Sequence, residues 1–255
     1  MVKGLDVFIE HFRRYTGHYI LIGGGAVDIN MEQKGIPFRV TKDLDIILIV
    51  ETLSDDLVKH FWRFIKDGEY AITQEGNKKT FYRFINPKTN GYPKMLKLFS
   101  RKPDLIKVAD GLHLTDIPTG EEVSSLSAIL MDDDYYNFTL KNATTTNDLH
   151  HATEVALIAL KAKAFLNNRA RKQAGQEVQE DDIIKHKKDI IRLTATLPPE
   201  IIIETPDAIR NDLTEYITVL QGENPDIKEL LKNQHMGSVS LEQIISQLKK
   251  TFEIK

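Results

Sequence analysis

The 255-residue sequence contains no cysteine and no long apolar run. The lack of cysteine excludes disulfides, thiolate metal ligands and a cysteine nucleophile together. The longest apolar run, from Ile46 to Val50, is far too short to cross a bilayer, and residues 1–6 lack the apolar core of a secretion signal. We therefore expect a cytoplasmic protein with no membrane segment.

An excess of charge of either sign is also missing. The 34 lysines and arginines nearly balance the 37 aspartates and glutamates, which leaves a net charge of −3. Such a balance gives no global attraction to nucleic acid or to an acidic membrane surface. A contact with RNA or with a nucleotide must therefore depend on a local group of basic residues.

What the sequence does contain is a change of pattern along its length. Residues 1–119 alternate between short apolar runs and helical periodicity, with strands expected at 19–22, 44–50, 79–85 and 95–100, and helices at 5–15, 26–33 and 54–66. Residues 120–255 read mainly as helices, and 132–149 as a long connection. The predicted fold class is α+β: a mixed sheet with packed helices in 1–119, followed by an all-helical lobe in 120–255.

The most informative segment lies between the first two predicted strands. Gly23, Gly24 and Gly25 form a turn before a helix, where backbone N–H groups can approach a phosphate. Asp43 and Asp45 are two residues apart on a strand, so their side chains share one face about 7 Å apart. Such a carboxylate pair can hold divalent ions that bridge triphosphate oxygens. Each half alone is commonly a plain turn or a solvated strand end, but their order together favours a nucleotide site.

This arrangement resembles a known signature. The pair Gly23-Gly24, followed after a helix by Asp43 and Asp45, resembles the polymerase-beta-like nucleotidyltransferase superfamily, and the resemblance implies that superfamily's mixed sheet. The wider pattern, Arg39-x-Thr41 directly before the two aspartates, is similar to the AbiEii-type branch, the toxin nucleotidyltransferases of abortive-infection and toxin–antitoxin systems.

The resemblance extends into the second lobe. Residues 160–164 and 185–193 are similar to that branch's helical Leu-Lys-x-x-Ala and Lys-x-x-Asp-Ile motifs, which implies catalytic roles for Lys161 and Asp189 and nucleotide contacts for Lys185 and His186. On a helix, Lys185, Asp189 and Arg192 share one face. A solvated row of ion pairs is the alternative reading of that face.

The resemblance implies an activity as well as a fold. The expected reaction transfers a nucleoside monophosphate from a nucleoside triphosphate to a hydroxyl of RNA, such as tRNA, or of a protein. Asp43 and Asp45 would hold Mg²⁺ or Mn²⁺, and the three glycines would cradle the triphosphate with contacts from Arg39, Thr41 and Lys97. The protein would then be the toxin of a pair, with a cognate antitoxin as partner.

Two departures from the superfamily pattern leave alternatives open. Gly25 stands where the superfamily usually has Ser or Thr, and the strand expected to carry a third carboxylate, 95–100, contains no acid. Lys97 is the candidate for that place. Either Asp104, Glu75 or another acid substitutes, or Lys97 contacts a phosphate directly, or the protein binds nucleotide without turning it over.

Three further hypotheses follow from the same residues. The same parts serve enzymes that transfer a nucleotide to a small hydroxylated molecule such as an antibiotic. The missing acid favours an inactive nucleotide-binding protein that acts through a protein partner. The aromatic residues Phe81, Tyr82 and Phe84, in a basic strand, suggest an RNA contact, although basic edge strands also prevent aggregation.

Overall fold

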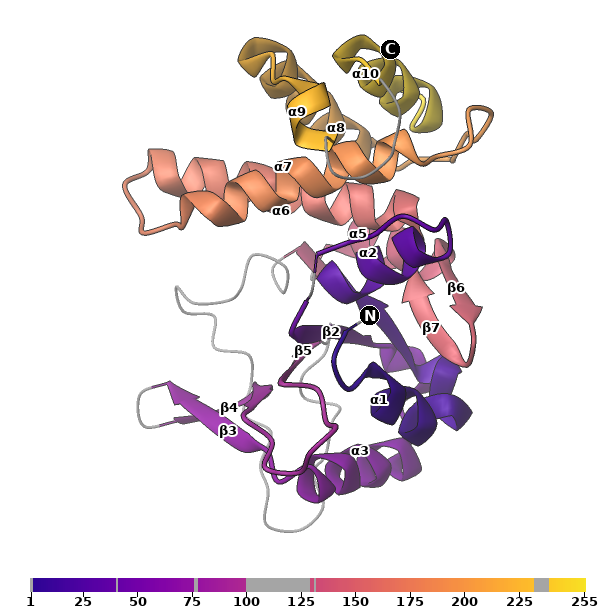
Figure 1. Cartoon of the computed structure of the whole chain (residues 1–255), viewed down its shortest axis with the longest axis vertical. Coiled ribbons are helices and arrows are strands. Elements are labelled where there is room, and N and C mark those ends of the chain that lie inside the picture. Colours follow the sequence, from indigo (N-terminus) through magenta and orange to yellow (C-terminus); the bar gives the residue numbers. More distant parts are fainter. Residues whose placement is uncertain (1, 40, 76–77, 100–128, 131, 232–238) are drawn as a thin grey trace.

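The structure is a computed structural model (Figure 1). It describes residues 2–39, 41–75, 78–99, 129–130, 132–231 and 239–255, without the side chains of 72–82. Among the helices in these ranges, none is both long and apolar enough to span a bilayer.

A seven-stranded mixed sheet forms the lower part of the molecule in Figure 1, with strand order β3-β4-β5-β2-β1-β7-β6. Its central strand β2 is parallel to β5 and antiparallel to β1, and β1 is parallel to β7. The strands are β1 (Tyr19–Ile22), β2 (Asp43–Leu48), β3 (Ala71–Glu75), β4 (Lys78–Ile85), β5 (Met95–Phe99), β6 (Ala143–Thr146) and β7 (Leu149–Ala152). The predicted mixed sheet of an α+β protein is confirmed.

Helices pack on this sheet and then continue beyond it. Figure 1 shows α6 and α7 side by side, with α8, α9 and α10 on their side away from the sheet. The α-helices are α1 (Leu5–Phe12), α2 (Gly23–Glu32), α3 (Asp55–Asp67), α5 (Asp133–Lys141), α6 (Glu154–Gln173), α7 (Glu180–Ala195), α8 (Asp207–Glu223), α9 (Ile227–Leu231) and α10 (Leu241–Thr251). A helical lobe thus follows the last strand, β7, along the chain, although β6 and β7 lie within the residues 120–255 that were predicted to be all helical.

The chain after residue 119 also contributes to the sheet, which the sequence did not predict. The segment 132–149, read as a connection, instead contains α5, β6 and the start of β7. The turn between β6 and β7 places Asn147 and Asp148 at φ of 50° and 60°, as a tight hairpin turn requires. The two strands are only four residues long, and β6 is polar, so hydrophobic alternation does not reveal them. The predicted boundary at 119 itself lies outside the described residues.

Strand alternation gives the sheet two chemically different faces. Leu44, Ile46 and Leu48 of β2 point to one side and are buried, whereas Asp43 and Asp45 point to the other. The β2–β5 register places Lys97 opposite Asp45, so Lys97 shares the side of the two aspartates. We call this side the aspartate face.

Candidate functional site

The glycine turn packs directly on the aspartate face. Helix α2 begins at Gly23 rather than at the predicted Ala26, and Gly23 has a φ of +66°, a left-handed conformation that favours glycine. A Cβ atom at Gly23 would overlap the Asp45 carboxylate, and one at Gly24 would lie 2.6 Å from Thr41 Cγ2. Gly23 is therefore favoured by its backbone conformation and by the close approach of Asp45, whereas a side chain at Gly24 would need Thr41 to shift. The structure brings together Gly23, Gly24, Thr41 and Asp45.

The third glycine has a different environment. A Cβ atom at Gly25 would make ordinary contacts with Leu44 and Leu21, at 3.5 and 3.6 Å. Gly25 thus packs over the apolar core, although its amide belongs to the first turn of α2. No side-chain cap from the described residues bonds the start of this helix, and its first turn contains no acid. A helix start of this kind is favourable for a bound anion.

Lys97 lies between the two aspartates. Its Nζ atom is 2.9 Å from Asp43 Oδ2 and 3.7 Å from Asp45 Oδ1. The side chains of Asp43, Lys97 and Asp45 are 34%, 29% and 15% exposed, so the group is in partial contact with water. An ammonium group therefore stands where the resemblance leads us to expect a third carboxylate.

Burial and the neighbouring charges shift the pKa values of this group in opposite directions. Burial raises the pKa of Asp45; the ammonium of Lys97 lowers it, and the neighbouring Asp43 raises it further. Burial by itself lowers the pKa of Lys97, but Asp45 and Asp43 outweigh that effect, so the pKa of Lys97 is raised. Lys97 is thus a permanent cation at neutral pH, beside a carboxylate that takes up a proton more readily than usual.

A second charged group is buried where the two lobes meet. Asp189, on α7, is fully buried and accepts hydrogen bonds from Lys161 Nζ on α6 at 2.9 Å and from Arg39 Nη2 at 2.8 Å. Arg192 Nη1 lies 3.4 Å from its other oxygen. Burial would raise the pKa of Asp189, but Lys161 and Arg39 outweigh burial and lower it. The cluster therefore ties the segment before β2 to helices α6 and α7.

Lys161 connects the two charged groups. Its charge lowers the pKa of Asp45 on the sheet, and its ammonium also pairs with Asp189 on α7. His186 lies near the same cations: burial, with a contribution from Lys161, lowers its pKa to about 4. The Nδ1 atom of His186 is buried and has no hydrogen-bond partner among the described residues. His186 is therefore a neutral, unsatisfied group beside the site.

Some predicted residues lie elsewhere or outside the described structure. Lys185 is half exposed and its ammonium contacts Asp182 at 3.2 Å, so it does not join the buried cluster. Asp104 and the side chain of Glu75 lie outside the described residues, as do the side chains of Phe81 and Tyr82. Phe84 is fully buried, so it cannot stack on an RNA base.

One member of the site was missed in the sequence. Phe38 places its ring beneath two guanidinium groups, with Arg39 Cζ at 5.1 Å and Arg192 Cζ at 5.9 Å from its centroid. Such stacking helps to hold both arginines near Asp189. The adjacency of an aromatic residue to Arg39 is the only signal in the sequence, and it is too common to be specific.

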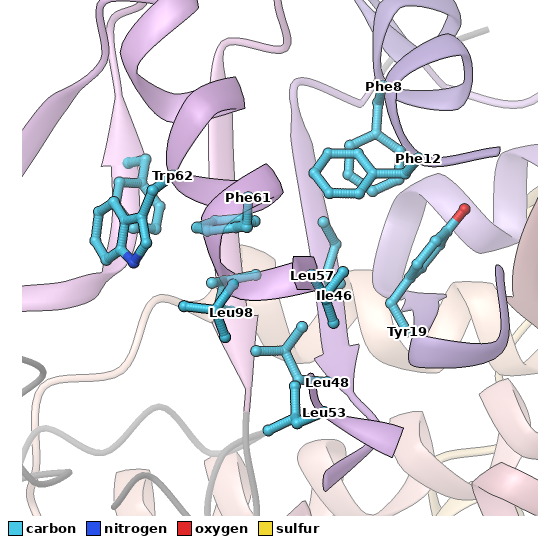
Figure 2. Close-up of a pocket in the computed structure, with 12 residues that line it drawn as sticks. Phe8, Phe12, Tyr19, Ile46, Leu48, Leu53, Leu57, Phe61, Trp62 and Leu98 are labelled. Carbon is cyan, nitrogen blue, oxygen red and sulfur yellow. The ribbon is translucent and has the colours of Figure 1, made fainter. Parts of the chain in front are cut away.

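An apolar pocket lies on the opposite face of the sheet (Figure 2). Its cavity volume is about 30 Å³, and it lies beneath α1 and α3 and is partly open to solvent. Ile46 and Leu98 line it, one position along the strands from Asp45 and Lys97, so the sheet separates the pocket from the charged groups. Its lining is apolar and aromatic, which offers little to recognise a phosphate.

Metal ligands are few at the site. Within the part of the chain that the structure describes, no group of three or more histidine, aspartate or glutamate side chains could hold a metal ion. Asp43 and Asp45 supply only two carboxylates, and both already contact Lys97. The described residues therefore do not fit a two-metal centre.

Comparison of the chain with models of protein families, with curated proteins and with solved structures finds no match.

Proposed function

We propose that this protein binds a nucleoside triphosphate on the aspartate face and transfers its nucleoside monophosphate to a hydroxyl group. The observation that carries the proposal is the close packing of the Asp45 carboxylate on Gly23 at the start of α2. This contact brings a carboxylate and the backbone amides of a helix start to one water-accessible place. A phosphate bound at those amides would have its reacting bond beside Asp45.

The charges of the site support an anionic ligand. Lys97, Lys161, Arg39 and Arg192 are four cations, against the three carboxylates of Asp43, Asp45 and Asp189. His186 is neutral because its pKa is lowered to about 4. The group thus has one positive charge in excess, although the whole chain has a net charge of −3.

The proposed reaction is a displacement at phosphorus. The acceptor oxygen attacks the α-phosphorus and forms a new P–O bond, while the bond from the α-phosphorus to the oxygen bridging to the β-phosphorus breaks and pyrophosphate leaves. Asp45 takes the acceptor's proton, because its raised pKa makes it a stronger base than an ordinary carboxylate. Lys97 and Lys161 stabilise the negative charge on the phosphoryl oxygens.

The cofactor and partners belong to the same proposal. Mg²⁺ or Mn²⁺ at Asp43 and Asp45 stays a prediction that the contacts of Lys97 disfavour. RNA such as tRNA, or a protein, stays the expected acceptor, and a toxin role with a cognate antitoxin in the cytoplasm stays the expected setting.

Transfer is tested by incubating the protein with each α-labelled nucleoside triphosphate, divalent cation and total RNA or protein. We expect label in one acceptor, lost in Asp45→Asn and Asp43→Asn. Asp182→Asn, at an exposed ion pair on α7, is the matched control and should retain transfer. Label that persists in both aspartate variants would refute the proposed site.

The alternative function is an inactive nucleotide-binding protein that works through a partner. The position of Lys97 between the two aspartates favours it, because an ammonium there replaces an expected carboxylate. Triphosphate binding that depends on Gly23 and Lys97, without transfer to RNA, protein or small hydroxylated acceptors, would establish this alternative.

A further inference from the structure

Lys97 is held in its place by the sheet itself. The parallel ladder between β2 and β5 runs in unbroken register from Asp43↔Met95 to Ile47↔Phe99, and it pairs Asp45 with Lys97. Both strands are buried on their other face through Leu44 and Leu96, so a shift of register would expose core residues. The ammonium therefore reaches the aspartates from a rigid backbone.

A second cation faces the same place. Arg83 on β4 is the antiparallel partner of Lys97, so its side chain leaves the sheet on the aspartate face. The charge of Arg83 lowers the pKa of Lys97, but the two aspartates raise it by more. Two adjacent strands thus present cations on the side of the sheet that carries the two aspartates.

The space between the aspartates is already taken. Lys97 Nζ lies 2.9 Å from Asp43 and 3.7 Å from Asp45, so a divalent ion bound by both carboxylates would meet the ammonium. Like charges at such a distance repel strongly. Gly23 borders Asp45 closely, because a Cβ atom at Gly23 would overlap the Asp45 carboxylate.

We propose that Lys97 is a built-in substitute for a divalent ion at the aspartate face, which excludes protein-bound metal and lets a triphosphate bind through protein cations. The part that concerns the triphosphate rests on the proposed function. The exclusion of metal rests only on the contacts of Lys97, so the two parts can be tested separately.

Metal exclusion is tested first, on the full chain without nucleotide. Mn²⁺ binding is measured by electron paramagnetic resonance for the wild type, Lys97→Gln and Lys97→Glu, with Lys141→Glu as the control. Lys141 is 65% exposed and pairs with Glu204, so its substitution adds the same charge away from the site. We expect Lys97→Glu to bind Mn²⁺ at least about tenfold more tightly than the wild type or Lys141→Glu.

The result depends on the two aspartates, which gives a second check. Tight Mn²⁺ binding by Lys97→Glu should disappear when Asp45→Asn is added. Wild-type protein that binds Mn²⁺ as tightly as Lys97→Glu, and loses it with Asp45→Asn, would overturn the inference. Melting curves of each variant confirm that it is folded.

Triphosphate binding is tested next by calorimetry with ATP, CTP, GTP and UTP, in EDTA and in Mg²⁺. We expect wild-type affinity in EDTA to stay within about threefold of that in Mg²⁺, to fall at least about tenfold in Lys97→Gln, and to be largely retained in Lys97→Arg. Binding that requires Mg²⁺ would overturn the inference. If no triphosphate binds under either condition, the proposed function fails, and the Mn²⁺ comparison still decides whether Lys97 excludes metal.

Discussion

Gly23 starts helix α2 with its α-carbon against the carboxylate of Asp45, which projects from the middle of the sheet. No side chain larger than hydrogen fits between them. The position of Asp45 and the path of the backbone into α2 therefore depend on each other, and a change at either residue should be felt at the other.

This relationship predicts a large effect of Gly23→Ala. The left-handed backbone costs an alanine about 1–2 kcal/mol, and overlap with Asp45 should add about 1–3 kcal/mol. Gly35→Ala is the matched control, because Gly35 has a φ of +69° and open space around it. Urea unfolding should show the greater loss for Gly23→Ala. Equal losses for the two variants would mean that the Asp45 contact does not restrict the turn.

Asp189→Asn should destabilise the protein by about 3 kcal/mol. The substitution leaves Lys161, which is 6% exposed, and Arg39 without their common carboxylate. Asp182→Asn removes an exposed ion pair on the same helix and should cost less than about 0.5 kcal/mol. Chemical unfolding measures both. A cost for Asp189→Asn as small as that of the control would show that the buried cluster is dispensable.

Asp45→Asn, unlike Asp189→Asn, should not lower the stability of the folded protein at pH 7. Burial raises the pKa of Asp45, so its charged form destabilises the folded state at neutral pH; that penalty is lost as the pH falls through the raised folded pKa and is gone below the ordinary carboxyl pKa of about 4. The amide should therefore leave the melting temperature unchanged or higher at pH 7, while transfer is lost. A lower melting temperature than wild type would mean that the ion pair with Lys97 outweighs the cost of burial.

The lowered pKa of Asp189 also predicts how the free energy of unfolding changes at low pH. Its lowered pKa means that the folded state keeps the carboxylate charged where the unfolded chain takes up a proton. This contribution is complete above the ordinary carboxyl pKa of about 4 and is lost as the pH falls through the lower folded value. Unfolding free energies from pH 5 to pH 2 should fall less steeply in Asp189→Asn than in the wild type.

His186 should stay neutral through the physiological range. Burial and Lys161 lower its pKa to about 4, so the unfolded state binds a proton first as the pH falls. The protein should lose stability through this group between about pH 6.5 and pH 4, and no more below that. The difference in stability between wild type and His186→Gln isolates the effect, and NMR titration of the imidazole gives its pKa. A midpoint near 6.5 would contradict the buried environment.

Local chemistry along the chain determined a large part of this protein. Short apolar runs were sufficient to predict β1 and β2, and apolar residues at helical spacing were sufficient to predict α3. The glycine turn before Asp43 and Asp45 was sufficient to select the segment in which the candidate site is proposed. The periodicity of apolar residues and the presence of turn residues each depend on only a few neighbouring positions, so both can be identified from the sequence alone. The strands β6 and β7 were not found, because each is only four residues long, β6 is polar, and β7 is placed in the sheet by pairing with β1, which is far along the chain.

The tertiary structure alone decided which charges meet. Strand register brought Lys97 between two aspartates, and packing of α6 and α7 buried Asp189 against Lys161 and Arg39, a contact that spans 150 positions of the chain for Arg39. Such pairings depend on the register of a ladder and on the packing of helices, and both are set by the whole core rather than by the residues that finally touch.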